Sequence, residues 1–320
     1  MVEPPIPAMT QLDMGFEVVE GFSRPNWTII QEFIKGHVSK EDLSPAWRFV
    51  AVRWLQELAA DLGGGARLRE SEHFYCLSDL PVGSIGTLLD FAESARQTIR
   101  ECLKTAVWGR FHGKHVLLVF SDPDDYYAYI SYFYGAGVHP QSGGVLIHKG
   151  YVHIALPAPT LAFTHSALAH ELVHNHLCHL AIPLWLNEGL AVVIEGRITH
   201  RGVTVDGELV DRLRAHWNET NIQGFWAGTA FGIPGDESEL SYSLAEILVC
   251  QLAAGECALD EFIKAADWRD GGQDAAARIL GHGLEELASG LLGPGNWRPQ
   301  RKVIKEQWQR PAPSATPPRP

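Results

Sequence analysis

This chain has few cysteines, and their spacing does not indicate that they pair with one another. The 320 residues include five of them, Cys76, Cys102, Cys178, Cys250 and Cys257, and no two stand in a C-x-x-C pair. An odd number without paired spacing argues against a disulfide framework. We therefore expect buried free thiols.

The sequence also lacks long apolar runs and a surplus of positive charge. No stretch approaches the roughly 20 apolar residues of a transmembrane helix, and the N-terminal residues show neither the basic start nor the apolar core of a signal peptide. Lys and Arg number 26 against 38 Asp and Glu, which gives a formal charge of −12. Because nucleic-acid binding needs a basic face for the phosphates, we expect no nucleic-acid partner. From the lack of an apolar span and of a signal peptide we expect no membrane partner and a cytoplasmic location.

One short motif carries chemistry. Residues 170–174 read H-E-L-V-H, which matches the pattern H-E-x-x-H. On a helix, residues four apart share a face, so His170 and His174 can present two imidazoles to one metal ion, and Glu171 can reach a water bound to it. Zinc suits imidazole ligands, and a catalytic zinc keeps one position open for water. The alternative is a helix that carries two surface histidines.

The surroundings of the motif favour a helix. The run from Ala167 to Leu180 contains no Gly or Pro, Thr164 or Ser166 can cap it, and Pro183 is expected to end it. An apolar flank of Leu168, Leu172 and Val173 can bury the helix and hold the imidazole rings still.

A candidate third ligand follows the motif. Residues 183–191 read P-L-W-L-N-E-G-L-A and predict a second helix, in which Glu188 stands fourteen positions after His174. This interval allows the chain to leave the first helix, turn at Pro183 and return a carboxylate to the metal. Two histidines and one glutamate leave a fourth position for water.

These two segments resemble the gluzincin zinc metallopeptidases, most closely their MA-like peptidase domains, in which W-L-x-E-G-L-A carries the third ligand. The resemblance implies that His170, His174 and Glu188 bind one Zn²⁺ ion and that Glu171 is the catalytic base. The interval between His174 and Glu188 is shorter than in the large aminopeptidases but suits the MA-like group. The resemblance covers about residues 70–292 and is sharp only across 170–195.

Further candidates for the site come from positions later in the chain. Tyr242, near the start of a predicted helix, is a candidate donor to a developing oxyanion, because related peptidases place a tyrosine at about this point; the alternative is a packing tyrosine. His200 and His216 are weaker donor candidates.

Two residues on the Glu188 helix are candidates for supporting roles. Glu195 lies seven positions after Glu188, on the same helix face, where it could accept a hydrogen bond from a ligand histidine; the alternative is a solvated charge. Asn187 could hold the substrate backbone or cap the helix. The remaining nearby candidates are expected to be flanking surface histidines and a packed thiol: His165, His176, His179 and Cys178.

The order of elements predicts an α+β fold: a zincin-like catalytic domain with a small mixed sheet, an active-site helix and a C-terminal helical part. Strands are expected at 72–77, 115–120, 143–147 and 151–156, and helices within 26–62 and at 85–107, 124–134, 209–217, 240–254, 259–266 and 283–292. The strand at 151–156 is a candidate free edge for an extended peptide, although an ordinary internal strand fits its pattern equally well.

The predicted organisation has five parts. They are a flexible leader (1–24), an N-terminal helical unit (25–65), the zincin-like catalytic subdomain with the metal site (66–197), an insertion with a C-terminal helical subdomain (198–297), and a basic, Pro-rich disordered tail (298–320).

Two functions are compatible with these features. The first is a zinc-dependent peptidase that acts on a peptide or protein substrate; the second is a catalytically silent metal-binding module that recognises a peptide or partner on the same fold. Residues 135–150 lack the Glu-bearing, Gly-rich loop of aminopeptidases, so an endopeptidase is slightly favoured over an aminopeptidase.

Overall fold

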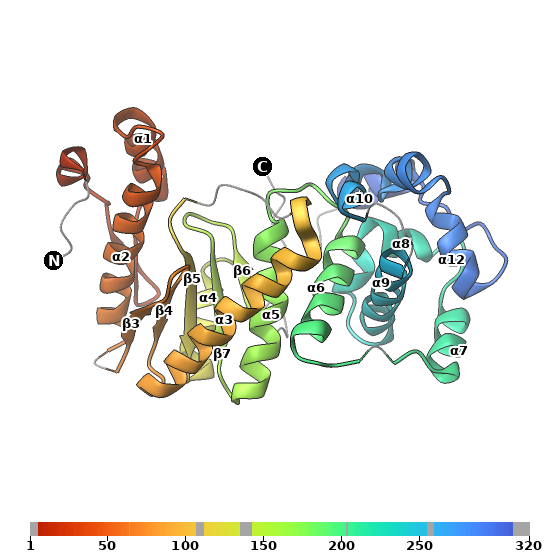
Figure 1. Cartoon of the computed structure of the whole chain (residues 1–320), viewed down its shortest axis with the longest axis horizontal. Helices are drawn as coiled ribbons and strands as arrows, with labels where there is room; N and C mark the ends of the chain where they lie inside the picture. The colour runs from red at the N-terminus through yellow and green to blue at the C-terminus, as the bar shows by residue number, and fades with distance from the viewer. Residues whose placement is uncertain are drawn as a thin grey trace. The chain divides into compact units, whose positions relative to one another are not determined.

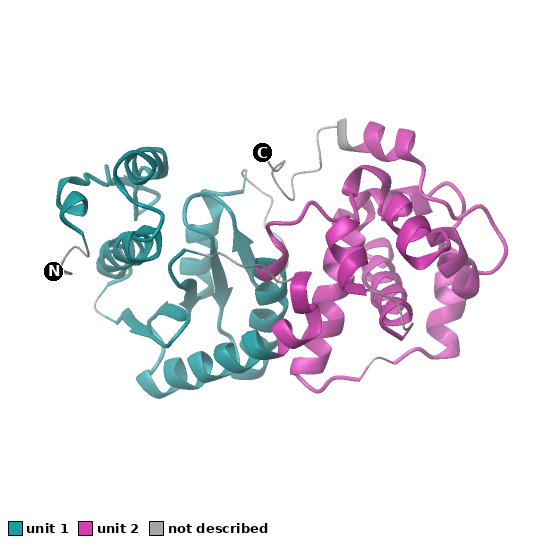
Figure 2. Cartoon of the chain, turned by 45° about the horizontal axis from the view of Figure 1, so that its top comes forward, with its two compact units in different colours: residues 1–97, 109–175 teal, residues 98–108, 176–320 magenta. Residues whose placement is uncertain are grey.

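A computed structural model of the chain describes residues 6–63, 65–106, 112–134, 143–202, 204–254 and 259–309. The chain forms two compact units (Figure 2). The first comprises Met1–Gln97 and Gly109–Asn175, and the second Thr98–Trp108 and His176–Pro320. Among the described residues, no helix combines the length and apolar character needed to cross a bilayer.

The first unit contains both sheets of the fold (Figure 1). Its elements in chain order, with α3 and α5 running on into the second unit, are η1 (Pro7–Gln11), β1 (Glu17–Val19), β2 (Phe22–Arg24), α1 (Trp27–His37), α2 (Leu43–Asp61), β3 (Arg67–Glu70), β4 (Phe74–Ser78), α3 (Val82–Leu103), β5 (His115–Phe120), α4 (Pro123–Ser131), β6 (Val145–Ile147), β7 (His153–Pro157) and α5 (Leu161–Leu177). The α+β fold class is as predicted.

A mixed five-stranded sheet with the order β3-β4-β5-β7-β6 organises this unit. The strands β4, β5 and β7 are parallel, and β3 and β6 add to the two edges in antiparallel direction. The run H-V-L-L-V-F of β5 forms the centre, because β-branched and large apolar side chains suit a strand that is buried on both faces.

Both faces of the sheet are covered. Tyr75, Val116, Leu118 and Ala155 on one face belong to one apolar core with side chains of α1, α2 and α4. Side chains alternate along a strand, so the intervening residues point to the opposite face, where Leu117 and Leu156 are also buried. Figure 1 shows α3 lying across the sheet, with α5 beside it.

The predicted free edge at 151–156 is wrong. The strand in this region, β7, pairs with β5 on one side and with β6 on the other. Between the two strands the chain turns at Gly150, whose φ of +75° suits glycine, and β7 therefore returns antiparallel along β6. In the described part of the chain no strand covers the outer side of β6, which takes the place of β7 at the edge.

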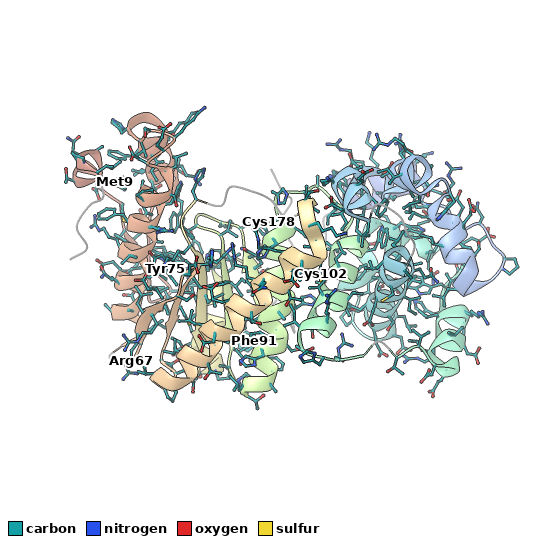
Figure 3. All side chains as sticks on the ribbon, viewed as in Figure 1. Met9, Arg67, Tyr75, Phe91, Cys102 and Cys178 are labelled. Carbon is teal, nitrogen blue, oxygen red and sulfur yellow. The ribbon has the colours of Figure 1, made fainter. Side chains whose placement is uncertain are left out.

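The predicted flexible leader is also wrong for residues 6–24. They form η1 and the hairpin of β1 and β2, and Met9, Leu12 and Met14 are buried in the core shared with α1 and α2. Figure 3 labels Met9 among the side chains of this unit. The three apolar side chains lie among prolines and polar residues without helical or strand periodicity, and their burial depends on contacts with helices later in the chain.

A buried histidine lies in the middle of this unit. His153 Nδ1 donates to the Tyr151 carbonyl oxygen at 2.6 Å, so in the neutral ring Nε2 accepts from the Tyr129 hydroxyl at 2.8 Å. Burial lowers the pKa of His153 to about 4, from an ordinary value of 6.5. Protonation would place a charge in the core and turn Nε2 into a donor opposite the Tyr129 hydroxyl.

We predict that His153 makes stability fall with acidification between pH 6.5 and pH 4. In that window the unfolded chain binds a proton that the folded chain does not, so the loss amounts to about 3 kcal/mol. Urea unfolding of the wild type and of His153→Gln at pH 7 and pH 4.5 measures the difference, since glutamine does not titrate. Equal losses of stability in the two proteins would contradict the prediction.

The second unit is helical in its described part. Its elements are η2 (Lys104–Ala106), α6 (Leu184–Ile198), α7 (Gly207–His216), α8 (Ile222–Ala227), η3 (Thr229–Gly232), α9 (Asp236–Ala254), α10 (Leu259–Ala265), η4 (Trp268–Asp270), α11 (Gln273–Ala275), the π-helical turn η5 (Ala276–Leu280), α12 (Leu284–Leu292) and α13 (Arg301–Gln309). Its core includes an aromatic cluster in which Trp185, Phe225 and Trp226 are fully buried.

The predicted disorder of the tail is wrong for residues 301–309, which form α13. Ile304 is fully buried, and Arg301 forms ion pairs with Asp270 and Asp274. Just before the helix, the Gln300 amide donates to Gln223 Oε1 at 2.8 Å. Among the described side chains of this helix Ile304 is the only fully buried apolar one, so the sequence shows little hydrophobic pattern that would predict the helix. Residues 310–320 lie outside the described part of the chain.

The described cysteines form no disulfide. Cys76 is buried, and burial raises the pKa of its thiol to about 12. Cys102, Cys178 and Cys250 are half-buried thiols, so among the described cysteines the expectation of burial is met fully only at Cys76. Cys257 lies outside the described residues.

Candidate metal centre

The helix α5, which carries the H-E-L-V-H motif, differs from its predicted limits at both ends. It begins at Leu161, where Thr160 Oγ1 accepts a hydrogen bond from the Phe163 amide at 3.3 Å, so neither Thr164 nor Ser166 is the cap. It ends at Leu177, before Pro183, which instead stands at the start of α6. The motif therefore lies in the second half of a regular helix.

Apolar packing fixes the orientation of α5. Leu168, Leu172 and Val173 are fully buried, as the predicted apolar flank requires. His170 and His174 lie one turn apart and are half-buried, with ring centroids 4.7 Å apart. Because the apolar side chains hold the helix, the two imidazoles occupy defined positions on one helical face.

The residues W-L-N-E-G-L-A of α6 have separate structural tasks. The Trp185 indole is fully buried, and its Nε1 donates to the Gly271 carbonyl oxygen at 2.9 Å, which anchors the first turn of the helix. A Cβ atom on Gly189 would lie 2.6 Å from the Ala245 carbonyl oxygen, so glycine lets α6 pack directly on α9. Glu188 stands between these two fixed points.

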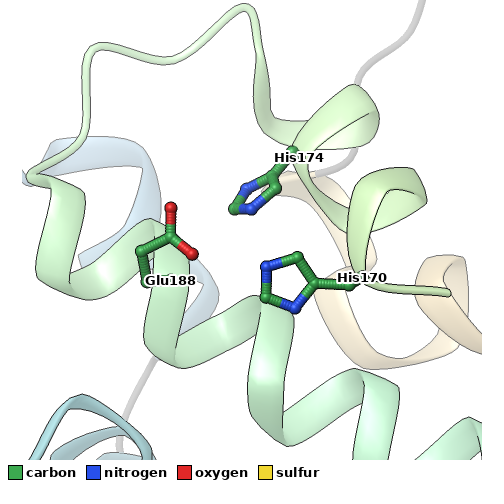
Figure 4. A group of neighbouring side chains, drawn as sticks. All are labelled: His170, His174 and Glu188. Atoms are coloured by element: carbon green, nitrogen blue, oxygen red, sulfur yellow. The ribbon is translucent and has the colours of Figure 1, made fainter. Parts of the chain in front are cut away.

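The structure brings His170, His174 and Glu188 together. One ligand atom from each residue lies within 4.8 Å of the other two, and Figure 4 shows the three side chains directed toward one another. Among the described residues this group could hold a metal ion. The two histidines come from α5 and the carboxylate from α6, as the sequence predicts.

The donor set fits zinc. Bonds of about 2.0–2.2 Å in tetrahedral geometry hold ligand atoms about 3.4 Å apart, so small side-chain adjustments from the observed spacing complete the coordination. Two imidazole nitrogens and one carboxylate oxygen are the ligands of catalytic zinc sites that retain an open position. The same set is rare in structural zinc sites, which close all four positions with protein ligands.

Glu171 is buried, with 8% of its surface exposed, and lies beside the strand at the sheet edge. A Cβ atom on Gly144, directly before β6, would overlap Leu156 and lie 3.3 Å from Glu171 Cγ. Burial and the nearby Glu171 carboxylate raise the pKa of Tyr134 to about 12. Tyr134 and Gly144 are thus neighbours of the motif that the sequence does not single out, because they precede it by 26 or more positions.

The other predicted site residues of α6 lie in distinct surroundings. Asn187 is buried, and its Oδ1 atom has no hydrogen-bond partner within the described residues. Glu195 is half-buried and close enough to Glu246 of α9 for its charge to raise the pKa of that carboxyl, after the larger effect of burial. Arg201 lies 3.7 Å from Glu246. The supporting roles of Asn187 and Glu195 remain predictions.

Tyr242 lies in the first half of α9, three positions before Ala245, where α9 meets α6. Its half-buried ring packs edge-on against Phe231, with centroids 5.2 Å apart. This packing agrees with both interpretations of the residue, and its role as an oxyanion donor remains a prediction. Of the weaker candidates, His200 is exposed and His216 packs against Trp217.

The histidines that flank the motif are not all surface residues. His176 is buried, which corrects the predicted surface position, because α5 is packed on more than one side near its end. His165 stacks on Phe91 of α3, with ring centroids 4.0 Å apart. His179 is exposed, as expected, and Cys178 is half-buried.

Comparisons with known proteins leave the family open. No family model matches the chain, and no curated protein matches it. A solved structure of native yeast LTA4 hydrolase is similar with a TM-score of 0.36 and 16% sequence identity, over 80% of this chain and 40% of that one. The chain thus spans less than half the length of the similar structure.

Proposed function

We propose that the chain is a gluzincin-like zinc peptidase that hydrolyses peptide bonds with Glu171 as general base. The observation that carries the proposal is the convergence of His170, His174 and Glu188, with one ligand atom from each within 4.8 Å of the others. A non-catalytic use of the metal requires neither an open fourth position nor a glutamate next to the first ligand.

Each residue has a defined task in this proposal. His170, His174 and Glu188 would hold one zinc ion, which when bound would polarise the substrate carbonyl and lower the pKa of a coordinated water. Glu171 would accept a proton from the attacking water and deliver it to the nitrogen of the leaving amine. Tyr242 would donate a hydrogen bond to the oxygen that becomes negative, and Glu195 would orient a ligand.

The edge of the sheet supports a peptide as the substrate. The outer side of β6 is not covered by another strand within the described residues, and Gly144, at its start, lies against Glu171. An extended peptide that pairs with β6 would therefore run past the general base. The preference for an endopeptidase rests on residues 135–150, of which 135–142 lie outside the described part of the chain, and it remains a prediction.

Metal analysis combined with digestion of a proteome-derived peptide library tests the proposal. We expect one zinc ion per chain, cleavage of library peptides, loss of cleavage on chelation and recovery on addition of zinc. Cleavage that persists in the metal-free protein would contradict the proposal. A zinc-loaded protein that cleaves none of the library would instead identify a silent module that recognises peptides or a partner.

A further inference from the structure

The second unit contains a cavity of about 870 Å³, formed by η4, α11, η5 and α13. This volume is within the range of small-molecule sites. Four basic side chains line it, together with three aspartates and the indole of Trp268. The π-helical turn η5 forms part of the wall, and such turns occur frequently at functional sites.

Two of the four basic residues pair with the three aspartates of the cavity. Arg269 lies 3.3 Å from Asp267. Arg301 pairs with the buried Asp270 at 3.2 Å and with Asp274. Asp270 additionally accepts hydrogen bonds from the backbone amides of Gly272 and Asp274, so it is committed to the local fold.

Two basic residues of the cavity remain without a partner. Arg278 on η5 and Lys305 on α13 form no ion pair or hydrogen bond within the residues that the structure describes, and both are exposed. They come from separate elements and line the same cavity. The lining carries four positive and three negative side chains. Two cations without a protein partner, in a protein with a formal charge of −12, indicate a site for a negatively charged ligand.

The cavity is built on a fixed turn. The Trp268 amide donates to the Ala181 carbonyl oxygen at 3.1 Å. The Gly271 carbonyl oxygen accepts from Trp185 Nε1 at 2.9 Å. The turn that presents Trp268 is therefore bonded to the segment that begins α6, and a site on it need not be ordered by its ligand.

We propose that this cavity binds a small molecule through a phosphate group, held by Arg278 and Lys305. A phosphate group has enough oxygens to accept hydrogen bonds from Arg278 and Lys305 at once, and the guanidinium fork of Arg278 suits the paired oxygens of a phosphate. The half-buried Trp268 indole, whose ring centroid lies 5.7 Å from Arg269 Cζ, is the aromatic side chain of the lining that an organic group attached to that phosphate would contact. The site is separate from the residues that are proposed to bind zinc.

Calorimetric titration of the full-length protein with inorganic phosphate, phenyl phosphate and phenylacetate tests this site. We expect phenyl phosphate to bind more tightly than inorganic phosphate, and phenylacetate to bind least. Arg278→Gln and Lys305→Gln should each weaken phenyl phosphate about tenfold or more, since a charge-assisted hydrogen bond contributes about 1.5–3 kcal/mol.

Lys302→Gln serves as the matched control, because Lys302 is exposed on the same helix α13 and does not line the cavity. Its affinity for phenyl phosphate should equal that of the wild type. Absence of phenyl phosphate binding at millimolar concentration would overturn the proposal. Binding that the Arg278 and Lys305 variants leave unchanged, or that Lys302→Gln weakens equally, would also overturn it.

Discussion

Replacing Glu171 by glutamine is expected to reduce peptide hydrolysis about 10²- to 10⁴-fold while zinc stays bound, because a positioned general base contributes about that factor. Glutamine keeps the shape of the side chain beside Gly144 but cannot accept the proton of the attacking water. The proposed metal ligands His170 and His174 are unchanged in this variant. Rates on library peptides, measured with the zinc content of the same sample, test the expectation.

A matched control separates the loss of the base from a general effect of removing a carboxylate. Glu261 is exposed in the first turn of α10, so Glu261→Gln should retain the wild-type rate and zinc content. If Glu171→Gln hydrolysed the same peptides at the wild-type rate, Glu171 would not be the base. If it lost its zinc, the lower rate would report on metal binding instead.

Much of the candidate site follows from local sequence. The helix with H-E-L-V-H is recognisable because its apolar residues share a flank and no Gly or Pro interrupts it, and Leu168, Leu172 and Val173 are buried as that flank predicts. The strand at 115–120 is found at its predicted limits, because a short β-branched run has few other ways to bury itself.

Features that depend on distant contacts could not be read in the same way. The sequence pattern of residues 151–156 does not show that β6 pairs with the outer side of β7. That pairing makes β6, and not β7, the edge strand. Met9 and Met14 are buried because they pack in one core with side chains of α1 and α2. The position of α13 depends in part on the ion pair between Arg301 and Asp270, which are distant in the sequence. The proximity of Tyr134 to Glu171 likewise depends on the three-dimensional course of the chain between them.

The structure explains why glycine occupies the central position of N-E-G-L-A, which the sequence shows only as a match to a motif. Gly189 has almost no space for a side chain, since a Cβ atom would meet the Ala245 carbonyl oxygen and Val249 Cγ2 within 2.7 Å. The close packing of α6 on α9 fixes the helix that presents Glu188. The segment therefore supplies both the carboxylate of the proposed third ligand, Glu188, and the glycine that fixes the position of its helix.

Zinc affinity should distinguish Glu188 from Glu195, two glutamates on one face of α6. Glu188→Gln replaces a proposed charged ligand by a neutral amide and should weaken zinc binding by more than about 100-fold, because even residues that only orient ligands change the affinity by about 10–100-fold. Glu195→Gln should fall within that smaller range if its carboxylate orients a ligand. Competition against a zinc-binding indicator gives both affinities, and thermal unfolding with added zinc gives an independent measure, since a ligand of the folded state stabilises by RT ln(1 + [L]/Kd).

The two glutamates share helix, face and chemical type, so a nonspecific effect of losing a negative charge would weaken zinc equally in both variants. Wild-type affinity in Glu188→Gln would remove Glu188 from the ligand set and with it the basis for a catalytic site. Wild-type affinity in Glu195→Gln, with the expected loss in Glu188→Gln, would leave the three ligands in place. Glu195 would then be assigned to the charges it neighbours, Glu246 and through it Arg201, where α6 and α9 pack together.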